Sequence, residues 1–130
     1  MSEIATKELL SELVSLPHLG LLHYLFSEAE GKHVAHCLEL DLIGAGDTCE
    51  AAAEKLDRLV KATIELALAT QQYANLATRA PQVFFDEFVD GTPIRLENKT
   101  LRISIPESVQ IVPVQESKIR ILAARAAHAA

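Results

Sequence analysis

Residues 33–60 read HVAHCLELDLIGAGDTCEAAAEKLDRLV. Side chains alternate between two faces across residues 33–38, which predicts a strand, and residues 40–45 predict another, shorter strand. From Cys49 onward, apolar residues recur at helical spacing, so we expect a long amphipathic helix that runs to about Asn75. Strands followed by one long helix place the chain in the α/β class.

Turns connect these predicted elements. Gly44-Ala45-Gly46 predicts a tight turn into the helix, and Asp47 is the predicted N-cap, with Glu50 three residues later in a variant of the capping box. Upstream, residues 21–27 alternate as a strand. A turn at residues 28–32 would join that strand to the next one as a hairpin, because its glycine can adopt a positive φ.

The two ends of the chain extend this core, which we place at residues 19–75. Residues 2–14 predict an N-terminal helix that ends before Pro17. Residues 82–113 predict a C-terminal β extension, with strands at 83–89, 92–96 and 100–105 and a turn at Asp90-Gly91. Residues 118–128 fit either a short basic helix or a disordered tail.

Length and charge limit the classes of function. A chain of 130 residues is expected to form a single domain, 1–130. Its net charge is −6, and residues 1–50 hold nine acids against two bases. An acidic first half repels phosphate and favours a basic partner, although surface acids can equally serve only to solvate the fold. Few aromatic residues and no Trp make a base-stacking platform unfavourable, so we do not expect a nucleic-acid partner.

Cysteines and histidines invite a metal-site hypothesis. Strand alternation sends His33 and Cys37 to one face and His36 to the other, and no spacing typical of zinc ligands supports Cys49. We therefore expect no metal and no other cofactor, with both cysteines acting as small buried apolar residues. No secretory signal and no membrane-spanning apolar run are seen, so we expect a cytoplasmic protein without a membrane partner.

Enzymatic hypotheses find little support in the residues. A two-metal nuclease needs several converging carboxylates, and only Glu39, Asp41 and Asp47 lie near predicted strand ends, with Asp47 already used as a cap. The glycines at 44–46 lack the further residues of a dinucleotide loop or a P-loop. We therefore expect no catalytic residues and no enzymatic activity.

The central pattern resembles the HicB-like antitoxin family. The resemblance lies in His33–Leu40, Gly44-Ala45-Gly46-Asp47-Thr48 and Glu50-Ala51-Ala52, and in the later Asp90-Gly91-Thr92-Pro93-Ile94. It implies a partial RNase H-like fold with three antiparallel strands, one helix across a face and a further edge strand. It also implies a non-catalytic domain that binds and occludes a small basic RNA-cleaving toxin.

These observations lead to a functional expectation. The chain is expected to be a stand-alone acidic protein-interaction module, with Glu28, Glu30, Glu39 and Asp41 contacting a basic partner through charge complementarity. Apolar crowding at residues 84–89 predicts contact with the N-terminal helix or a second subunit, hence a homodimer or higher homo-oligomer. Two alternatives stay open: a DNA-binding regulator that uses residues 100–130, and an orphan oligomeric domain.

Overall fold

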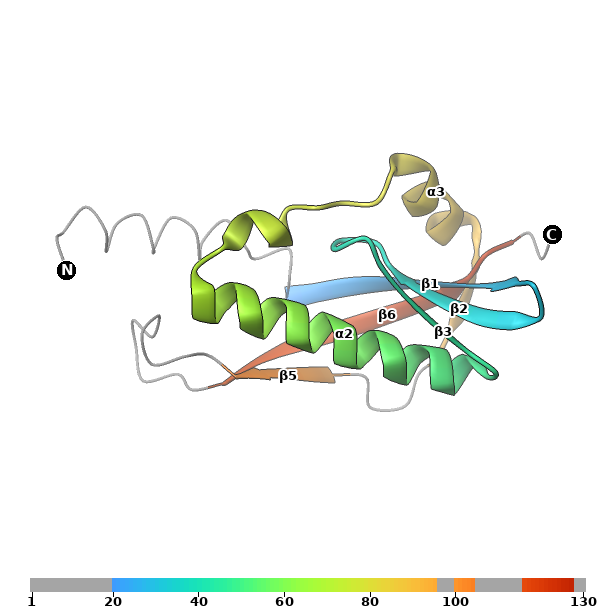
Figure 1. The fold of residues 1–130 in the computed structure, drawn as a ribbon. Coiled ribbons are helices and arrows are strands. Elements are labelled where there is room, and N and C mark those ends of the chain that lie inside the picture. The colour runs from blue at the N-terminus through green and yellow to red at the C-terminus, as the bar shows by residue number, and fades with distance from the viewer. Residues whose placement is uncertain (1–19, 96–99, 105–115, 128–130) are drawn as a thin grey trace, which may run out of the picture.

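The structure is a computed structural model that describes residues 20–95, 100–104 and 116–127. It is mixed α/β, with a six-stranded, mostly antiparallel sheet and two α-helices, which confirms the predicted class (Figure 1). In chain order the elements are β1 (Leu21–Ala29), β2 (Lys32–Cys37), β3 (Leu42–Gly46), α2 (Cys49–Thr70), the 3-10 helix η2 (Tyr73–Leu76), α3 (Gln82–Asp90), β4 (Thr92–Ile94), β5 (Thr100–Ser104) and β6 (Glu116–Arg125). The helix predicted at residues 2–14 lies outside the described residues.

The strand order of the sheet is β3-β2-β1-β6-β4, and β5 also pairs with β6. Strands β1, β2 and β3 form consecutive antiparallel pairs, as the hairpin prediction requires. Strand β6 runs parallel to β1, with Leu21 opposite Arg120, and antiparallel to β4 and β5. The first and last described strands are therefore neighbours in the middle of the sheet.

The β1–β2 connection is a two-residue loop. Ala29 pairs with Lys32, and the residues between them, Glu30 and Gly31, have φ values of 51° and 77°. Two positive φ angles define the turn whose twist matches that of antiparallel strands. The prediction that Gly31 adopts a positive φ is confirmed.

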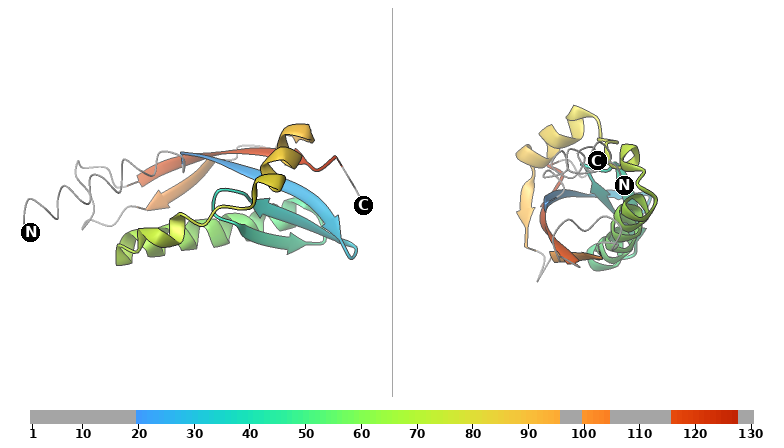
Figure 2. Two further views of the ribbon diagram at one scale, coloured as in Figure 1. Left: turned by 90° about the horizontal axis from the view of Figure 1, so that it is seen from above. Right: turned by 90° about the vertical axis from the view of Figure 1, so that its left-hand side faces the viewer.

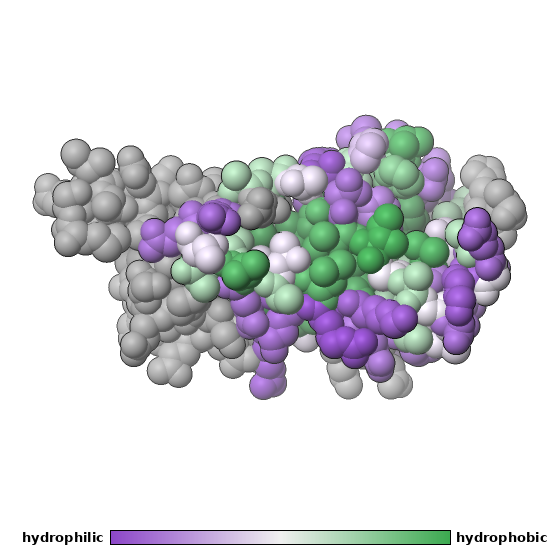
Figure 3. Space-filling view, in the orientation of Figure 1, coloured by the Kyte–Doolittle hydropathy of each residue, from purple (hydrophilic) through white to green (hydrophobic). Residues whose placement is uncertain are grey.

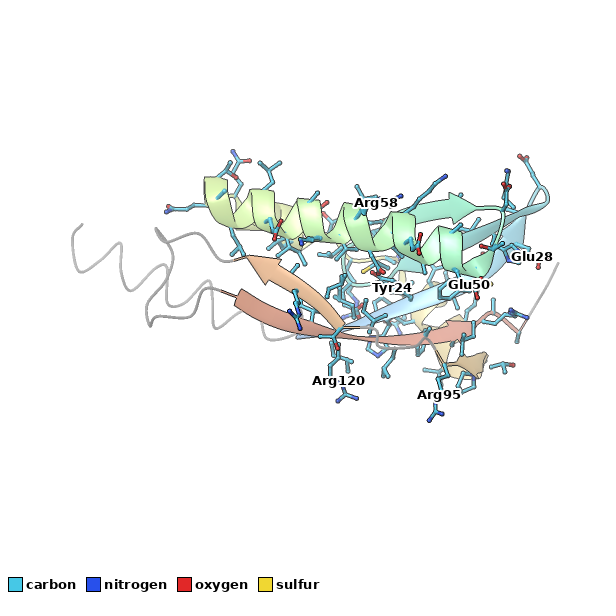
Figure 4. All side chains as sticks on the ribbon, turned by 90° about the horizontal axis from the view of Figure 1, so that it is seen from below. Tyr24, Glu28, Glu50, Arg58, Arg95 and Arg120 are labelled. Atoms are coloured by element: carbon cyan, nitrogen blue, oxygen red, sulfur yellow. The ribbon has the colours of Figure 1, made fainter. Side chains whose placement is uncertain are left out.

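Helices α2 and α3 lie on opposite sides of the sheet (Figure 2). Because β1 side chains alternate between faces, Leu22, Tyr24 and Phe26 join the main core beneath α2, whereas Leu25 joins a smaller cluster beneath α3. Figure 4 shows Tyr24 between the sheet and α2. Its hydroxyl donates to Asp57 Oδ1 at 2.8 Å, and burial is the main cause that raises the pKa of Tyr24.

The N-cap of α2 is Thr48, so the prediction of Asp47 was wrong by one residue. The Thr48 hydroxyl accepts from the Ala51 backbone N–H at 3.0 Å, and Thr48 has extended backbone angles. Asp47 instead contacts the side chain of Lys32. The helix ends at Thr70, before the predicted limit, because Gln71 adopts a left-handed conformation with φ 56°.

The cap assignment gives a first testable prediction. We expect Thr48→Ala to lower the free energy of unfolding by about 1 kcal/mol, because one of the first N–H groups of α2 loses its acceptor. Asp47→Ala should leave the free energy of unfolding close to the wild-type value, since this exposed ion pair contributes little. Urea unfolding followed by circular dichroism compares the two variants. A larger loss for the Asp47 variant would contradict the assignment.

Residues 82–90 form helix α3, so the prediction of a strand at 83–89 was wrong. In a short apolar run, residues four apart share a face in both a helix and a strand, and Phe84 and Phe88 fit either pattern. The predicted hairpin at Asp90-Gly91 is wrong as well. Residues 92–94 do form strand β4, but its partner is β6.

Residues 116–125 form strand β6, which corrects the prediction of a basic helix or disordered tail. The alternation of Ile119 and Ile121 with basic residues is a strand pattern, and both isoleucines are buried. Ala123 and Ala124, which point to opposite faces of the sheet, are both buried, because side chains cover β6 on the α2 side and on the α3 side. Sheet pairing on both edges thus overrides the helical preference of an alanine-rich sequence.

Candidate protein-interaction surface

Strand β3 is a terminal strand of the described sheet and carries no charged side chain. Its glycines let α2 come unusually close. A Cβ at Gly44 would stand 2.7 Å from Leu56 N and 2.8 Å from Ala52 O. A Cβ at Gly46 would stand 2.8 Å from Ala51 Cβ. The sequence Gly-Ala-Gly therefore fixes the helix directly on this edge of the sheet.

Apolar side chains are exposed beside this edge. Ile43 on β3 is 55% exposed, and Leu59 and Leu66 on α2 are 41% and 65% exposed. Leu59 and Leu66 continue, at two-turn spacing, the helical row that begins with Ala52, which faces β3 at Gly44. Ile43 is opposite His36, whose ring contacts α3, so the Ile43 side chain lies on the other side of the sheet from α2. We call Ile43 and the two leucines, which lie on the two sides of the sheet, the β3 surface. Figure 3 shows hydrophobic residues gathered on this face over β3, above the hydrophilic side of α2.

The predicted partner-binding acids lie at opposite ends of β2. Glu28 and Glu30 lie at the β1–β2 turn, while Glu39 and Asp41 lie at the β2–β3 turn. Glu28 and Glu50 occupy the same end of the molecule, where α2 begins (Figure 4). The structure therefore separates the four residues into two pairs instead of gathering them in one patch.

Glu39 and Asp41 each bind a histidine within the fold. His23 Nδ1 lies 2.7 Å from Glu39 Oε2, and the His23 backbone N–H donates to Glu39 Oε1. His36 Nε2 lies 2.6 Å from Asp41 Oδ1. Both Glu39 oxygens are thus used, and its side chain is only 11% exposed, whereas Asp41 is more accessible.

Helix α3 covers both histidines with aromatic rings. Phe88 meets the ring of His23 edge-on, and Phe84 meets that of His36, each with centroids 4.9 Å apart. Each histidine is therefore bound by a carboxylate and covered by a phenylalanine. This arrangement fixes α3 to the outer face of the sheet and gives Glu39 a role within the fold.

Asp47 closes the other end of β3. Its carboxylate pairs with Lys32, and this hydrogen bond holds the pKa of Asp47 below its ordinary value. Asp41 precedes β3 and Asp47 follows it, so an uncharged strand has an acid at each end. An exposed apolar strand bounded by carboxylates suits a partner that is apolar at its centre and basic around it.

A small pocket lies at the end of the sheet where α2 begins, and we call it the Cys49 pocket. It is lined by Phe26, Ser27, Glu28, His33, Cys49, Arg125 and Ala126. Cys49 Sγ lies 3.4 Å from His33 Nδ1, and Arg125 Nη2 donates to the same sulfur at 3.8 Å. Among the residues with described positions, no three His, Cys, Asp or Glu side chains are grouped to hold a metal ion.

Sequence reasoning missed two parts of this pocket. It treated Cys49 as a buried apolar residue, although the side chain is partly exposed. It also assigned Arg125 to a helix or tail, although β6 brings this arginine to the start of α2. The alternation of residues 118–121 was the available signal for β6, and nothing local indicated which strand it would pair with.

Comparison of the chain with family models, with curated proteins and with solved structures finds no match. The resemblance to HicB-like antitoxins therefore stays a prediction that depends on the residues quoted above. Within the described ranges, no helix is both long enough and apolar enough to cross a bilayer.

Proposed function

We propose that this protein is a non-catalytic protein-interaction module, similar to HicB antitoxins, that binds a small basic RNA-cleaving protein at the β3 surface. The observation that carries the proposal is the exposed apolar side chain of Ile43 on an uncharged terminal strand. Such an edge offers backbone hydrogen bonds to an added strand, and its apolar side chains supply affinity.

The sheet supports this proposal through its arrangement. Strands β1, β2 and β3 are antiparallel, and α2 covers one face of them, as the resemblance implies. Strand β6 adds to the sheet alongside β1, whereas the resemblance implies a further edge strand and does not place it. In this description β6 is an interior strand, because β4 and β5 pair with it.

Charge supports the choice of a basic partner. Four acidic residues with exposed side chains lie near the ends of β2 and β3. They are Glu28, Glu30, Asp41 and Asp47. Carboxylates in these positions would steer a cationic protein toward the apolar contact and repel a phosphate backbone. Glu39 is left out of the contact set, because its oxygens bind His23.

The alternative of a DNA-binding regulator gains no support from the described residues. Residues 116–125 form a strand whose inward side chains are buried, and residues 105–115 lie outside the description. A reading helix in the major groove would need this segment to be helical. The orphan oligomer stays the competing proposal. The sequence predicts a subunit contact at residues 84–89, and the exposed Ile43 is a further apolar side chain that such an assembly would bury.

The test is capture of a partner from the organism that encodes the chain. Tagged wild-type protein is expected to retain a small basic protein, and added wild-type chain should inhibit RNA cleavage by that protein. Ile43→Ser should weaken the complex by about 10–100-fold, because burial of one isoleucine contributes about 1.5–3 kcal/mol. Val89→Ser is the matched control, since Val89 is 81% exposed on α3.

Three results would contradict the proposal. If Ile43→Ser and Val89→Ser lose the partner to the same extent, the β3 surface is not the binding site. Magnesium-dependent RNA cleavage by the chain alone would make it an enzyme. A wild-type dimer that Ile43→Ser converts to a monomer in sedimentation, with no other protein bound, would favour the orphan oligomer.

A further inference from the structure

The Cys49 pocket brings a nucleophilic side chain together with a histidine and an arginine from distant parts of the chain. Cys49 is the first residue of the 22-residue helix α2, His33 comes from β2, and Arg125 ends β6. The floor includes Phe26 and Ala126, so the pocket has an apolar wall beside its polar groups. Cys49 is partly exposed, which leaves the sulfur open to small solutes.

Two basic side chains lie against the sulfur at the start of α2. His33 Nδ1 lies 3.4 Å away and can take the thiol proton, and the Arg125 guanidinium donates a hydrogen bond to sulfur. The position at the start of a long helix adds the positive end of its dipole. Glu28 Oε1 lies 3.8 Å from the same His33 nitrogen, so the imidazole stands between the thiol and a carboxylate.

The second cysteine provides an internal comparison. Cys37 is fully buried in the main core. Burial raises the pKa of its thiol from 9.0 to about 12. A buried neutral thiol is inert toward water-soluble reagents, so the two cysteines of one chain differ sharply in environment.

We propose that Cys49 is a thiol-modification site that reacts with small anionic disulfides. The Cys49 proton passes to His33, and the thiolate attacks one sulfur of the disulfide. The old S–S bond breaks as the new one forms, so that Cys49 is oxidised to a mixed disulfide. The other half of the reagent is reduced and leaves as a thiolate. Arg125 and His33 select a negatively charged reagent, and Phe26 accommodates an apolar group.

The experiment uses the folded full chain and 5,5′-dithiobis(2-nitrobenzoate), an anionic aromatic disulfide, at pH 7. One thiol per chain is expected to react quickly and the second only in denaturant. Cys49→Ser should abolish the fast reaction, whereas Cys37→Ala should retain it. These two variants leave His33 and Arg125 unchanged, so they test the site even where other substitutions disturb folding.

Further variants test the role of the neighbours. We expect His33→Gln to slow the fast reaction about tenfold and Arg125→Gln about threefold, with Arg125→Lys close to wild type. Cystamine, a cationic disulfide, should react with Cys49 more slowly than the anionic reagent does. The Arg125→Glu substitution should bring the two reaction rates closer together. Fast labelling of Cys37, or wild-type rates in folded His33→Gln and Arg125→Gln, would overturn the proposal.

Discussion

Gly44→Ala is expected to lower the free energy of unfolding by about 2–4 kcal/mol, although it adds one methyl group. The added Cβ would stand 2.7 Å from Leu56 N and 2.8 Å from Ala52 O, both backbone atoms of α2. Rigid backbone cannot yield as a flexible side chain can, so α2 must move off β3. Urea unfolding of the variant and the wild type measures the loss.

Gly20→Ala is the matched control for this substitution. A Cβ at Gly20 would meet no atom of the described residues within 4 Å, so the same chemical change should alter stability by less than about 0.5 kcal/mol. Wild-type stability in Gly44→Ala would show that α2 does not approach β3 as closely as described. It would also remove the physical basis for the shape of the β3 surface.

The second large effect is expected at alkaline pH. Burial raises the pKa of Cys37 to about 12 and raises that of Tyr24 above its ordinary range. At alkaline pH the folded chain therefore keeps the Cys37 and Tyr24 protons that the unfolded chain releases. Stability is fully present below the unfolded pKa values, which are about 9 for the thiol and 10 for the phenol, and falls as pH rises through them. Each group should contribute a loss of about 1.4 kcal/mol per pH unit.

Urea midpoints between pH 7 and pH 11 measure this loss of stability. Two variants separate the contribution of Cys37 from that of Tyr24. Cys37→Ala should remove the part that begins near pH 9, and Tyr24→Phe the part that begins near pH 10. Each variant has its own offset at neutral pH, so the slopes against pH are compared. A flat profile in the wild type, or unchanged slopes in both variants, would show that these groups do not ionise on unfolding.

The sequence predicts the local half of the fold well. Strands β1 and β2, their glycine turn and the start of α2 follow from patterns within a few residues. Strand β3 was predicted as well, but Gly44-Ala45-Gly46, predicted as a tight turn, are its last three residues. The predicted cap missed by one position, because Asp47 and Thr48 are both good caps and only backbone geometry distinguishes them. The resemblance to a known family concerned mainly this segment and, beyond it, only Asp90–Ile94, so it did not place α3 or β6.

The nonlocal pairing could not be predicted from the pattern of residues, although the strand predicted at 100–105 is confirmed as β5. Strand β6 depends on pairing with β1, and a strand of this kind is recognised by its partner more than by its composition. The same dependence hid Arg125 from the candidate sites. Glu39 was selected for its charge, and only the fold reveals that His23 already binds both of its oxygens.

The place of β6 has a consequence for biosynthesis. Leu21 pairs with Arg120, so the middle of the sheet joins segments that lie far apart in the chain and leave the ribosome at different times. Until residues 116–125 have left the ribosome, β1 has one edge without its partner and the nascent core stays open to water. High contact order predicts slow closure, and a chaperone that shields the β1 edge would raise the yield of native protein.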